Sequence, residues 1–332
     1  MAPREPRFDV TVAGELNLDL ILDGLPESLP TERELLARKM TLTLGSSSAI
    51  LAHNLAVLGS RVGFASRIGG DPLGEIALEK LAAAGAEVSQ VRRAAGSTTG
   101  LTVILSRPGP RHILTYPGAM FEMCFEDLDL NYLADARHFH VSSFYLHRAL
   151  LPRLSEIFER MKRSGLTTSL DTNDDPEGRW NSGLERTLPF VNILFLNAHE
   201  AVKTARADSL DKALGKLSGQ VPTVVVKAGP EGAVARQGDK EFRSRPPAVE
   251  TVDAVGAGDS FDAGFLHQYV RGAGIETCLA YGNLAGALST TRTGGTEAFR
   301  DRAHVVKFFQ EHSASGPSAD GGQPLPSVAA KR

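Results

Sequence analysis

The chain has 332 residues, of which 42% are hydrophobic and 23% charged, as in globular proteins with one large core. Its formal charge of −3 provides no basic surplus to neutralise a phosphate backbone, so we expect no nucleic-acid partner. No segment approaches about 18 uninterrupted apolar residues, and the N-terminus lacks a signal-peptide run, so we expect no membrane association and a cytoplasmic location. The two cysteines, Cys124 and Cys278, are too few to suggest a disulfide framework or a metal site.

Short apolar runs alternate with segments of helical periodicity along the chain. In the segment 150–165, Leu151, Leu154, Phe158 and Met161 share one helical face, and Gly165 is a typical stop. The segment 69–86 has the same form, with Asp71 as the expected N-cap, Pro72 in the first turn and Gly85 after the last. Strands are predicted at 8–13, 139–141, 166–170, 192–195 and 221–226. This alternation predicts an α/β fold with a doubly wound, mostly parallel sheet flanked by helices.

Two regions interrupt the alternation. Residues 15–44 and 97–117 contain strand-like pieces without helical periodicity, and the second has a hairpin signal around 107–110. We expect them to form a small β-sheet that projects from the main domain as a lid. The last residues, 313–332, are small, polar and rich in Gly and Pro, so we expect a disordered tail after a domain that spans 8–312.

The stretch DAVGAGDSFDAGF, residues 253–265, combines a glycine-rich turn with an acidic residue. Gly256, Ala257 and Gly258 lead into a predicted helix, and backbone N–H groups at such a helix start form an anion hole. Asp259 follows directly. It is either the helix N-cap, with Asp262 completing a capping box, or a base that takes a proton from a hydroxyl attacking a phosphoryl group.

The same stretch closely resembles the C-terminal signature of the ribokinase-like (PfkB) family of ATP-dependent sugar kinases. The segments GELNLD (14–19), 66–86 and NAHE (197–200) match other family motifs in the expected order, over roughly residues 8–310. The resemblance implies a ribokinase-like fold, with ATP and Mg²⁺ as cofactors and a monovalent cation such as K⁺ as a further one. It makes Asp259 the catalytic base and Gly256, Ala257 and Gly258 the anion hole. Ala254 stands where the family commonly has Thr.

On the sugar side, the resemblance assigns Asn17 and Asp19 to the substrate hydroxyls. The glycine pair of the family becomes Gly45-Ser46, and Ile50 takes the place of the usual Asn. Ser46 and Ser47 either supply hydroxyls instead or cap a helix. Ser142 and Ser143 follow a predicted strand and could line the same pocket, whereas His138, His140 and His147 have no metal spacing, and we expect His140 in the core.

On the nucleotide side, Asn197 and Glu200 match the family's Asn-x-x-Glu motif, which positions Mg²⁺-bound phosphates largely through water; as an alternative they form a capping box. The resemblance places Lys227 and Gly229 near the nucleotide phosphates, and Asp171 and Asn173 near phosphates or substrate. Asn283 and Ala287 are candidates for the adenine pocket, although small residues there equally indicate close helix packing.

These assignments predict a carbohydrate kinase that transfers the γ-phosphoryl group of ATP to a hydroxyl, which we expect to be a primary alcohol. The alternatives are a nucleoside kinase of the same family and a non-catalytic sugar- or nucleotide-binding regulator, which Ile50 favours. The resemblance also implies a homodimer formed through the lid.

Overall fold

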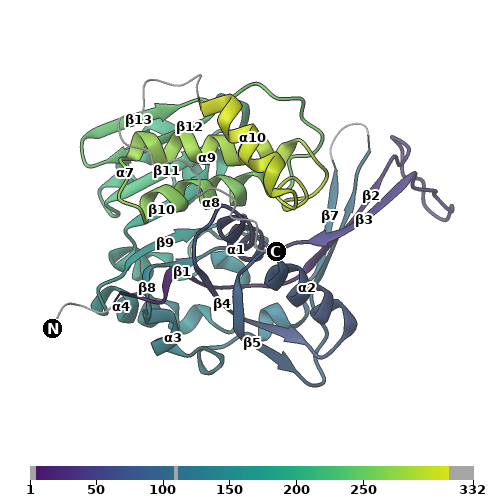
Figure 1. Cartoon of the computed structure of the whole chain (residues 1–332), viewed down its shortest axis with the longest axis horizontal. Helices are drawn as coiled ribbons and strands as arrows, with labels where there is room; N and C mark the ends of the chain where they lie inside the picture. The colour runs from purple at the N-terminus through teal and green to yellow at the C-terminus, as the bar shows by residue number, and fades with distance from the viewer. Residues whose placement is uncertain (1–4, 108–110, 314–332) are drawn as a thin grey trace, which may run out of the picture.

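A nine-stranded sheet forms the centre of the computed structural model, which describes residues 5–107 and 111–313 (Figure 1). The strand order is β13-β12-β11-β10-β9-β8-β1-β4-β5; β11 to β5 are parallel, and β12 and β13 add an antiparallel hairpin at one edge. The strands are β1 (Phe8–Ala13), β4 (Val62–Gly69), β5 (Glu87–Ala94), β8 (Ala136–Val141), β9 (Thr167–Asp171), β10 (Ile193–Asn197), β11 (Thr223–Lys227), β12 (Ala233–Gln237) and β13 (Lys240–Ser244). All five predicted strands are confirmed, and so is the mostly parallel sheet.

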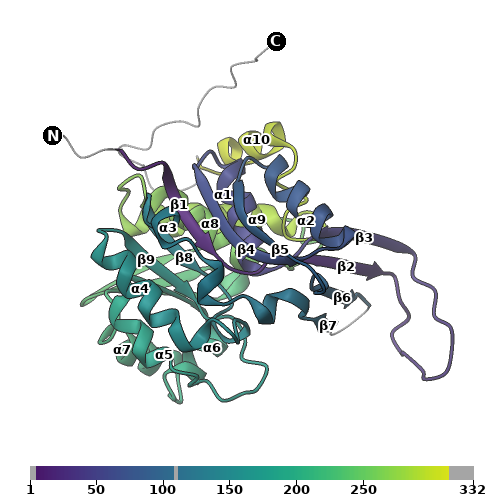
Figure 2. The same cartoon turned by 90° about the horizontal axis from the view of Figure 1, so that it is seen from below.

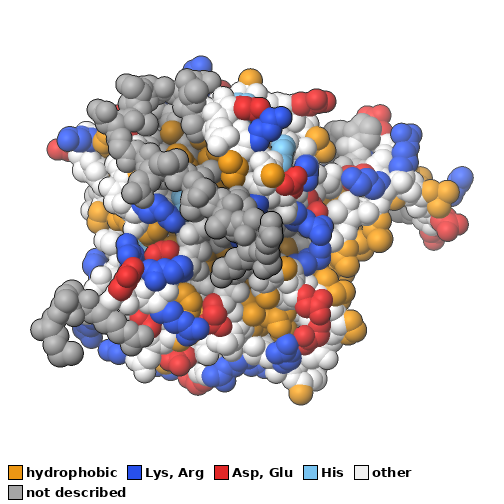
Figure 3. Space-filling model, in the orientation of Figure 1, with side chains coloured by type: hydrophobic (Ala, Val, Ile, Leu, Met, Phe, Trp, Pro, Cys, Tyr) orange, Lys and Arg blue, Asp and Glu red, His pale blue; other side chains and the backbone are white. Residues whose placement is uncertain are grey.

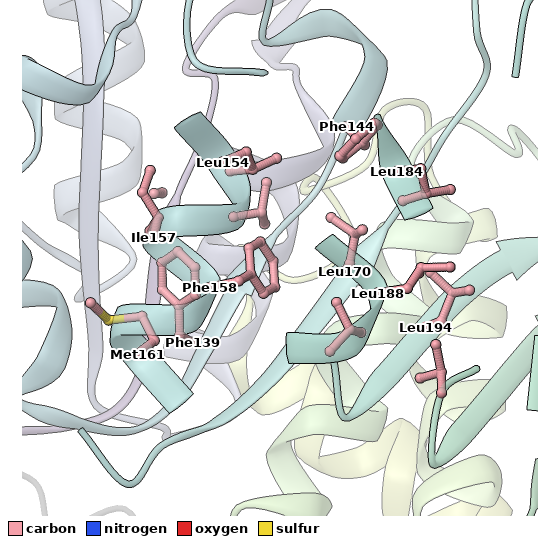
Figure 4. Close-up of a cluster of buried hydrophobic side chains, with 14 of the residues drawn as sticks. Phe139, Phe144, Leu154, Ile157, Phe158, Met161, Leu170, Leu184, Leu188 and Leu194 are labelled. Atoms are coloured by element: carbon pink, nitrogen blue, oxygen red, sulfur yellow. The ribbon is translucent and has the colours of Figure 1, made fainter. Parts of the chain in front are cut away.

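Helices cover both faces of this sheet (Figure 2). One face packs against α1 (Ser47–Val57), α2 (Pro72–Ala83), α8 (Ala257–Tyr269) and α9 (Ile275–Thr290), and α10 (Arg302–Ser313) packs on α9. The other face packs against α3 (Leu130–Ala134), α4 (Leu154–Arg163), α5 (Leu184–Thr187), α6 (Ala198–Thr204) and α7 (Leu210–Ser218). In this second core, Phe139 and Leu170 of the sheet lie against Phe158 of α4 (Figure 4). None of the described helices is long and apolar enough to cross a membrane.

Local sequence signals account for most helix ends. The Asp71 carboxylate accepts the Gly74 N–H at 2.9 Å, and Pro72 opens α2, as expected. Gly85 and Gly165 follow α2 and α4 with φ of +102° and +90°, a backbone conformation that glycine adopts without strain. The helix α4 begins at Leu154; Leu151 lies in a preceding 3₁₀ turn and packs against the same core.

The chain changes direction of travel between β1 and β8. From β1 it runs outward to β4 and β5, and it then crosses back to β8 and runs to β9, β10 and β11 on the other side. In open α/β sheets, ligands bind beyond the carboxyl ends of the strands at such a reversal. This edge of the sheet is therefore where the site is expected.

A separate four-stranded sheet projects from the main body, as predicted for the lid (Figures 1 and 2). Its order is β3-β2-β6-β7, with β2 (Leu18–Asp23) and β3 (Lys39–Leu44) from the first predicted region and β6 (Leu101–Leu105) and β7 (His112–Tyr116) from the second. Antiparallel pairing of β6 with β7 confirms the hairpin, whose turn residues 108–110 lie outside the described residues. The expected tail also lies outside them, apart from Ser313 at the end of α10.

The two faces of the lid differ in chemistry. The register places Asp19, Thr43 and Thr102 on one face. The next row, on the opposite face, consists of Leu20, Leu42, Val103 and Leu114. Hydrophobic side chains gather along the lid on the right of Figure 3, and the Leu114 side chain is 57% exposed. A continuous apolar sheet face open to water is typical of a protein–protein contact.

We predict that this apolar face packs against the lid of a second copy. Leu114→Glu should convert a homodimer to a monomer, because a carboxylate in the apolar contact would be buried without a partner. Ile113 is a matched control: it is 56% exposed on the same strand but lies on the opposite face, so Ile113→Glu should leave the dimer intact. Light scattering coupled to size-exclusion chromatography measures the mass. A wild-type protein that is monomeric at all concentrations contradicts the prediction.

Candidate active site

Polar side chains end three neighbouring parallel strands. Asp171, Asn197 and Lys227 are the last residues of β9, β10 and β11, and Asn197 lies directly beside Lys227 in the register. Gly258, in the first turn of α8, lies over the same edge: a Cβ atom added to it would be 3.4 Å from Lys227 Nζ. The topology therefore brings together residues that are far apart in the sequence, from Asp171 to Gly258.

Lys227 is a buried cation held between two buried acids. Its Nζ lies 2.7 Å from Asp171 Oδ2 and 3.0 Å from Asp262 Oδ2. Burial disfavours the charge of Lys227, but the two carboxyl groups raise its pKa above the ordinary value. Burial also disfavours the charge of Asp171 and would raise its pKa. The nearby Lys227 charge outweighs burial, so the pKa of Asp171 is lowered. Asp171 and Lys227 thus form an ion pair at the sheet edge.

Asp262 differs from Asp171 in its protonation. It is fully buried, its Oδ1 has no hydrogen-bond partner among the described residues, and burial raises its pKa well above the ordinary range. Its side chain is also hydrogen-bonded to Asp171, which a neutral acid can achieve by donating its proton. We therefore assign one net negative charge, on Asp171, to the pair of acids around Lys227.

The glycine-rich turn forms the start of α8. Gly256 is the N-cap, with φ of +71°, and a Cβ atom there would come within 2.6 Å of the Gly295 Cα. The helix begins at Ala257, so Asp259 is its third residue, and no side chain caps this end. The alternative of an Asp259 N-cap with an Asp262 capping box is therefore wrong: the left-handed Gly256 starts the helix earlier. The N–H groups of Gly258 and Asp259 have no acceptor among the described residues, as a helix start that receives an anion requires.

Asp259 lies across the site from the lid residue Asp19. Burial raises the pKa of Asp259 to about 7, with Asp171 adding to the effect and Lys227 and a hydrogen bond from Ser47 opposing it. Burial also raises the pKa of Asp19 to about 7, reinforced by the charges of Asp259 and Asp253. The Asp259 charge acts on Asp19, which places the two carboxyl groups near one another, one from β2 and one from α8. A hydroxyl between them could donate to either.

The predicted sugar-side residues gather at the hinge of the lid. Asn17 and Asp19 are 4% and 5% exposed. Ser46 Oγ accepts the Asn17 N–H at 2.8 Å, and a Cβ atom on Gly45 would overlap Asp19 Oδ1. Ser46 occupies the N-cap position of α1, as the alternative had it, but it makes no side-chain cap bond, and Ser47 is the first helical residue. The Ser46 hydroxyl orders the backbone of Asn17 instead.

Ile50 and Asn54 both face away from the expected sugar contacts. Ile50 is 2% exposed, and its side chain packs where Gly256 and Gly295 leave room for it. Asn54 Nδ2 donates to Ser260 Oγ at 2.9 Å and to the Gly295 carbonyl at 3.1 Å, so it does not replace the family's Asn. Ile50 and Asn54 therefore hold α1 against the glycine-rich turn at the start of α8.

Asn173 brings a different amide to the site. Its Nδ2 donates to Ser47 Oγ, and its Oδ1 accepts the Ser143 N–H at 3.4 Å. Ser47 in turn is hydrogen-bonded to Asp259. The chain Asn173–Ser47–Asp259 therefore links β9 and α1 to the predicted base.

Glu15 is a site residue that the sequence reasoning missed. It is 2% exposed, accepts the Ser48 N–H and hydroxyl at 3.2 and 2.7 Å, and accepts the Ser143 hydroxyl at 2.7 Å. Its Oε2 also lies 3.2 Å from His147 Nε2. Burial would raise the pKa of Glu15, but His147 and the two hydroxyls lower it to about 2. Glu15 thus joins the start of α1 to the end of β8, below the predicted sugar contacts.

Asn197 and Glu200 form the capping box that was the alternative to a metal role. Asn197 Oδ1 accepts the Glu200 N–H at 2.9 Å, and Glu200 Oε2 accepts the Asn197 N–H at 2.8 Å. Burial, reinforced by the Asp171 charge, raises the pKa of Glu200 to about 7. Within the part of the chain that the structure describes, no group of three or more acidic, His or Cys residues could hold a metal directly. The pair could reach a hydrated Mg²⁺ only through water.

The candidates for the adenine pocket lie on α9, which packs closely against α8. Gly282 and Gly286 allow Phe261 and Ala257 to approach closely, which confirms the expected close packing. Asn283 is 5% exposed, and its Nδ2 has no hydrogen-bond partner among the described residues. That amide could donate to a ligand. Ala287 is also buried, whereas Gly229 is exposed in a turn after β11 with φ of +57°.

The histidines of β8 are core residues, as expected for His140. Ser169 Oγ lies 2.6 Å from His138 Nε2 and 2.7 Å from His140 Nδ1, and His140 Nε2 lies 2.8 Å from Ser142 Oγ. Burial lowers the pKa of His140 to about 3. The hydroxyl of Ser142, a predicted sugar-site residue, is therefore hydrogen-bonded within a buried network of neutral side chains.

A family model described as pfkB family carbohydrate kinase matches residues 7–302. The chain belongs to the pfkB family. A pfkB kinase is a phosphotransferase with an alcohol group as acceptor, and the relatives of this chain act on sugars or nucleosides. It is 28% identical to an ATP-dependent ribose-1-phosphate kinase of Halopiger xanaduensis, over 91% of this chain and 98% of the relative. It is also 28% identical to a nucleoside kinase of Methanothermobacter thermautotrophicus, over 91% and 95%, and 29% identical to a fructokinase of Klebsiella pneumoniae, over 87% and 95%.

Solved structures confirm the ribokinase-like fold of this pfkB kinase. Arabidopsis thaliana ribokinase, complexed with ribose and ATP, superimposes with a TM-score of 0.77 at 24% identity, covering 91% of this chain and 99% of that one. A candidate ribokinase II from Escherichia coli in complex with ATP and Mg²⁺ gives a TM-score of 0.81 at 24% identity, covering 92% and 100%.

The charge assignment around Lys227 predicts that two substitutions lower the free energy of unfolding by different amounts. Lys227→Met should lower the free energy of unfolding by about 3 kcal/mol, because it leaves the buried Asp171 charge without a partner. Asp262→Asn should change it by less than about 1 kcal/mol, since a neutral amide replaces a neutral acid of the same shape. Urea unfolding at pH 7 compares the two. An equally large loss in Asp262→Asn would show that Asp262 is ionised.

Proposed function

We propose that this pfkB kinase transfers the γ-phosphoryl group of ATP to a hydroxyl of a neutral sugar, with Asp259 as the base. One observation carries the proposal: at the start of α8 the N–H groups of Gly258 and Asp259 have no acceptor among the described residues, and the Asp259 charge acts on Asp19. An anion hole and a base side by side can act on the two partners of one reaction, the phosphoryl group and the attacking hydroxyl.

In the proposed reaction, different residues of the chain would bind the sugar, accept its proton and stabilise the phosphoryl group. Asp19 and Asn17 would accept and donate hydrogen bonds to the sugar, and Asp259 would take the proton of the attacking oxygen. A base with a pKa near 7 is largely deprotonated at slightly alkaline pH and still basic enough to accept that proton. The N–H groups of Gly258 and Asp259, with the Lys227 charge behind them, would stabilise charge on the transferring phosphoryl group.

The electrostatics of the site fit a metal-bound nucleotide. Asp171, Glu200 and Asp259 crowd around Lys227, so a bare polyphosphate would be repelled. A bound Mg²⁺ would supply positive charge that offsets the charge of the phosphates. Asn197 and Glu200 would orient its water ligands.

The two other predicted cofactor contacts fit unequally. The Asn283 amide, which has no hydrogen-bond partner among the described residues, would donate to the adenine ring of ATP. For K⁺, the loop 253–255 offers little: Ala254 has no hydroxyl, and Asp253 already accepts from Val255, Gly294 and Arg111, so the proposal includes no K⁺.

The charges around Asp19 favour an uncharged acceptor. Its neighbours Asp259 and Asp253 are acidic, and the nearby Arg111 is paired with Asp253 at 3.2 Å. A phosphorylated sugar would meet this acidic surface. Release of ADP from Mg·ATP over a panel of sugars, sugar phosphates and nucleosides tests the choice. A nucleoside as the best acceptor, or tight sugar binding without turnover, supports the nucleoside kinase or the regulator instead.

We predict that Asp259→Asn lowers kcat/KM by about 100-fold or more, because the amide cannot accept the proton. In the wild type, kcat/KM should rise with pH and level off above about 7, the pKa of Asp259. Initial rates from pH 5.5 to 9 measure both. Near-wild-type turnover in the variant rejects Asp259 as the base.

The same variant provides its own folding control. The folded-state pKa of Asp259 is raised, so the ionised form is disfavoured in the fold and stability is lost as pH rises from about 4 to 7. Asp259→Asn should therefore be more stable than the wild type at pH 8, by about 4 kcal/mol, and equal to it near pH 4.

Gly45→Ala tests the sugar contact. The added Cβ would overlap Asp19 Oδ1, so Asp19 must move, and KM for the sugar should rise by about tenfold while KM for ATP stays unchanged. Gly215→Ala in α7 is the matched control, because its Cβ meets only Arg236 Nη1 at 3.7 Å. Equal changes of both KM values in Gly45→Ala would place Asp19 outside the sugar site.

A further inference from the structure

A hollow of 290 Å³ lies between α1, α2 and the segment 296–302, away from the residues assigned to the reaction. Its charged lining residues are Lys80, Glu297, Arg300 and Arg302, and His53 and Thr296 complete the polar lining. Three cations against one acid leave a surplus of two positive charges. That surplus and the volume suit a small multiply charged anion.

The cations differ in how far they are engaged. Arg300 Nη1 pairs with Glu297 Oε2 at 3.1 Å, and Arg302 Nη2 makes a long 3.4 Å hydrogen bond to the Ala84 carbonyl. Lys80 is partly buried and has neither an ion pair nor a hydrogen bond among the described residues. The Lys80 charge acts on Glu297 without a direct ion pair, and an anion in the hollow would give its ammonium group a direct partner.

His53 supplies a second, independent indication of a ligand. It is 5% exposed, and its Nδ1 lies 2.8 Å from Asn54 Oδ1. The Asn54 amide nitrogen donates elsewhere, so its oxygen is the acceptor and the hydrogen of His53 is on Nδ1. Nε2 is then a bare acceptor, with no partner among the described residues. Burial, which lowers the pKa of His53 to about 4, keeps the ring neutral.

An acceptor amid cations selects among anions. Hydrogen phosphate, or a singly protonated phosphate ester, has negative oxygens for Lys80 and Arg300 and one hydroxyl that can donate to His53 Nε2. Sulfate has the same shape and charge as hydrogen phosphate but no hydroxyl, so it would place a lone pair against that nitrogen.

The same histidine connects the hollow to the catalytic helix. His53 is hydrogen-bonded to Asn54, and Asn54 donates to Ser260, the residue after Asp259, and to the Gly295 carbonyl. Gly295 lies directly against Gly256 at the start of α8. A ligand that moves His53 therefore acts on the anion hole from two sides.

We propose that this hollow is a second anion site, for hydrogen phosphate or the protonated phosphate group of a small metabolite, and that its occupant acts on α8 through His53 and Asn54. The binding step is independent of the reaction. The effect on turnover rests on the proposed function.

Calorimetric titration with inorganic phosphate and with sulfate tests the site, on the full chain, at constant ionic strength, with Mg²⁺ and a non-hydrolysable ATP analogue occupying the nucleotide site. Phosphate should bind with one-to-one stoichiometry and sulfate at least tenfold more weakly. Lys80→Gln should weaken phosphate binding at least tenfold. Lys212→Gln, on the distant helix α7 and paired with Asp208, should not. Equal affinity for sulfate, or unchanged phosphate binding in Lys80→Gln, overturns the proposal.

Steady-state rates with and without phosphate test the link to α8. If phosphate competes with ATP at the nucleotide site, KM for ATP rises in every variant. If phosphate acts through the proposed link, kcat changes by at least twofold in the wild type and does not change in Lys80→Gln. Unchanged kcat in a wild type that binds phosphate overturns the link. Absence of turnover with every acceptor rejects the proposed function instead, and the calorimetric result still decides the site.

Discussion

The buried charge of Lys227 is the constraint on which the active-site edge depends. A lysine ammonium at the end of a central strand needs carboxyl groups within hydrogen-bond reach, and it obtains them from β9 and from α8. This requirement fixes α8 against the carboxyl ends of the strands, so the helix start and its free N–H groups point into the site. The position of Asp259 is therefore a consequence of how Lys227 is neutralised.

Close approach of backbone and acids depends on residues without side chains. Gly258 leaves room for the Lys227 ammonium, Gly256 for Gly295, and Gly45 for the Asp19 carboxylate. At each position a Cβ atom would push apart groups that have to meet. Glu15 performs the corresponding task below the predicted sugar contacts, where one carboxylate joins α1 to the segment that follows β8.

Local signals in the sequence predicted the strands, the capped helix α2 and the division into sheet and lid, because periodicity and caps act within a few residues. Asp259 and Asn17 were predicted as site residues because their segments resemble family motifs in the expected order, and their roles belong to the proposed function. Glu15 could not, since its partners Ser48 and Ser143 are 33 and 128 residues away and its burial follows only from the fold. The N-cap of α8 was missed because Asp is the commoner cap, whereas the left-handed turn at Gly256 starts the helix three residues earlier.

Asp19 and Asp259 together explain why a polyol suits this site. Burial raises the pKa of both carboxyl groups to about 7, and the Asp259 charge adds to the effect on Asp19, so at neutral pH the pair is only partly ionised. A hydroxyl that donates to a carboxylate favours its charged form. Binding a sugar between them would therefore lower both pKa values, and Asp259 would be left ionised when the phosphoryl donor is in place. The acceptor itself would then complete the protonation state that the proposed base needs.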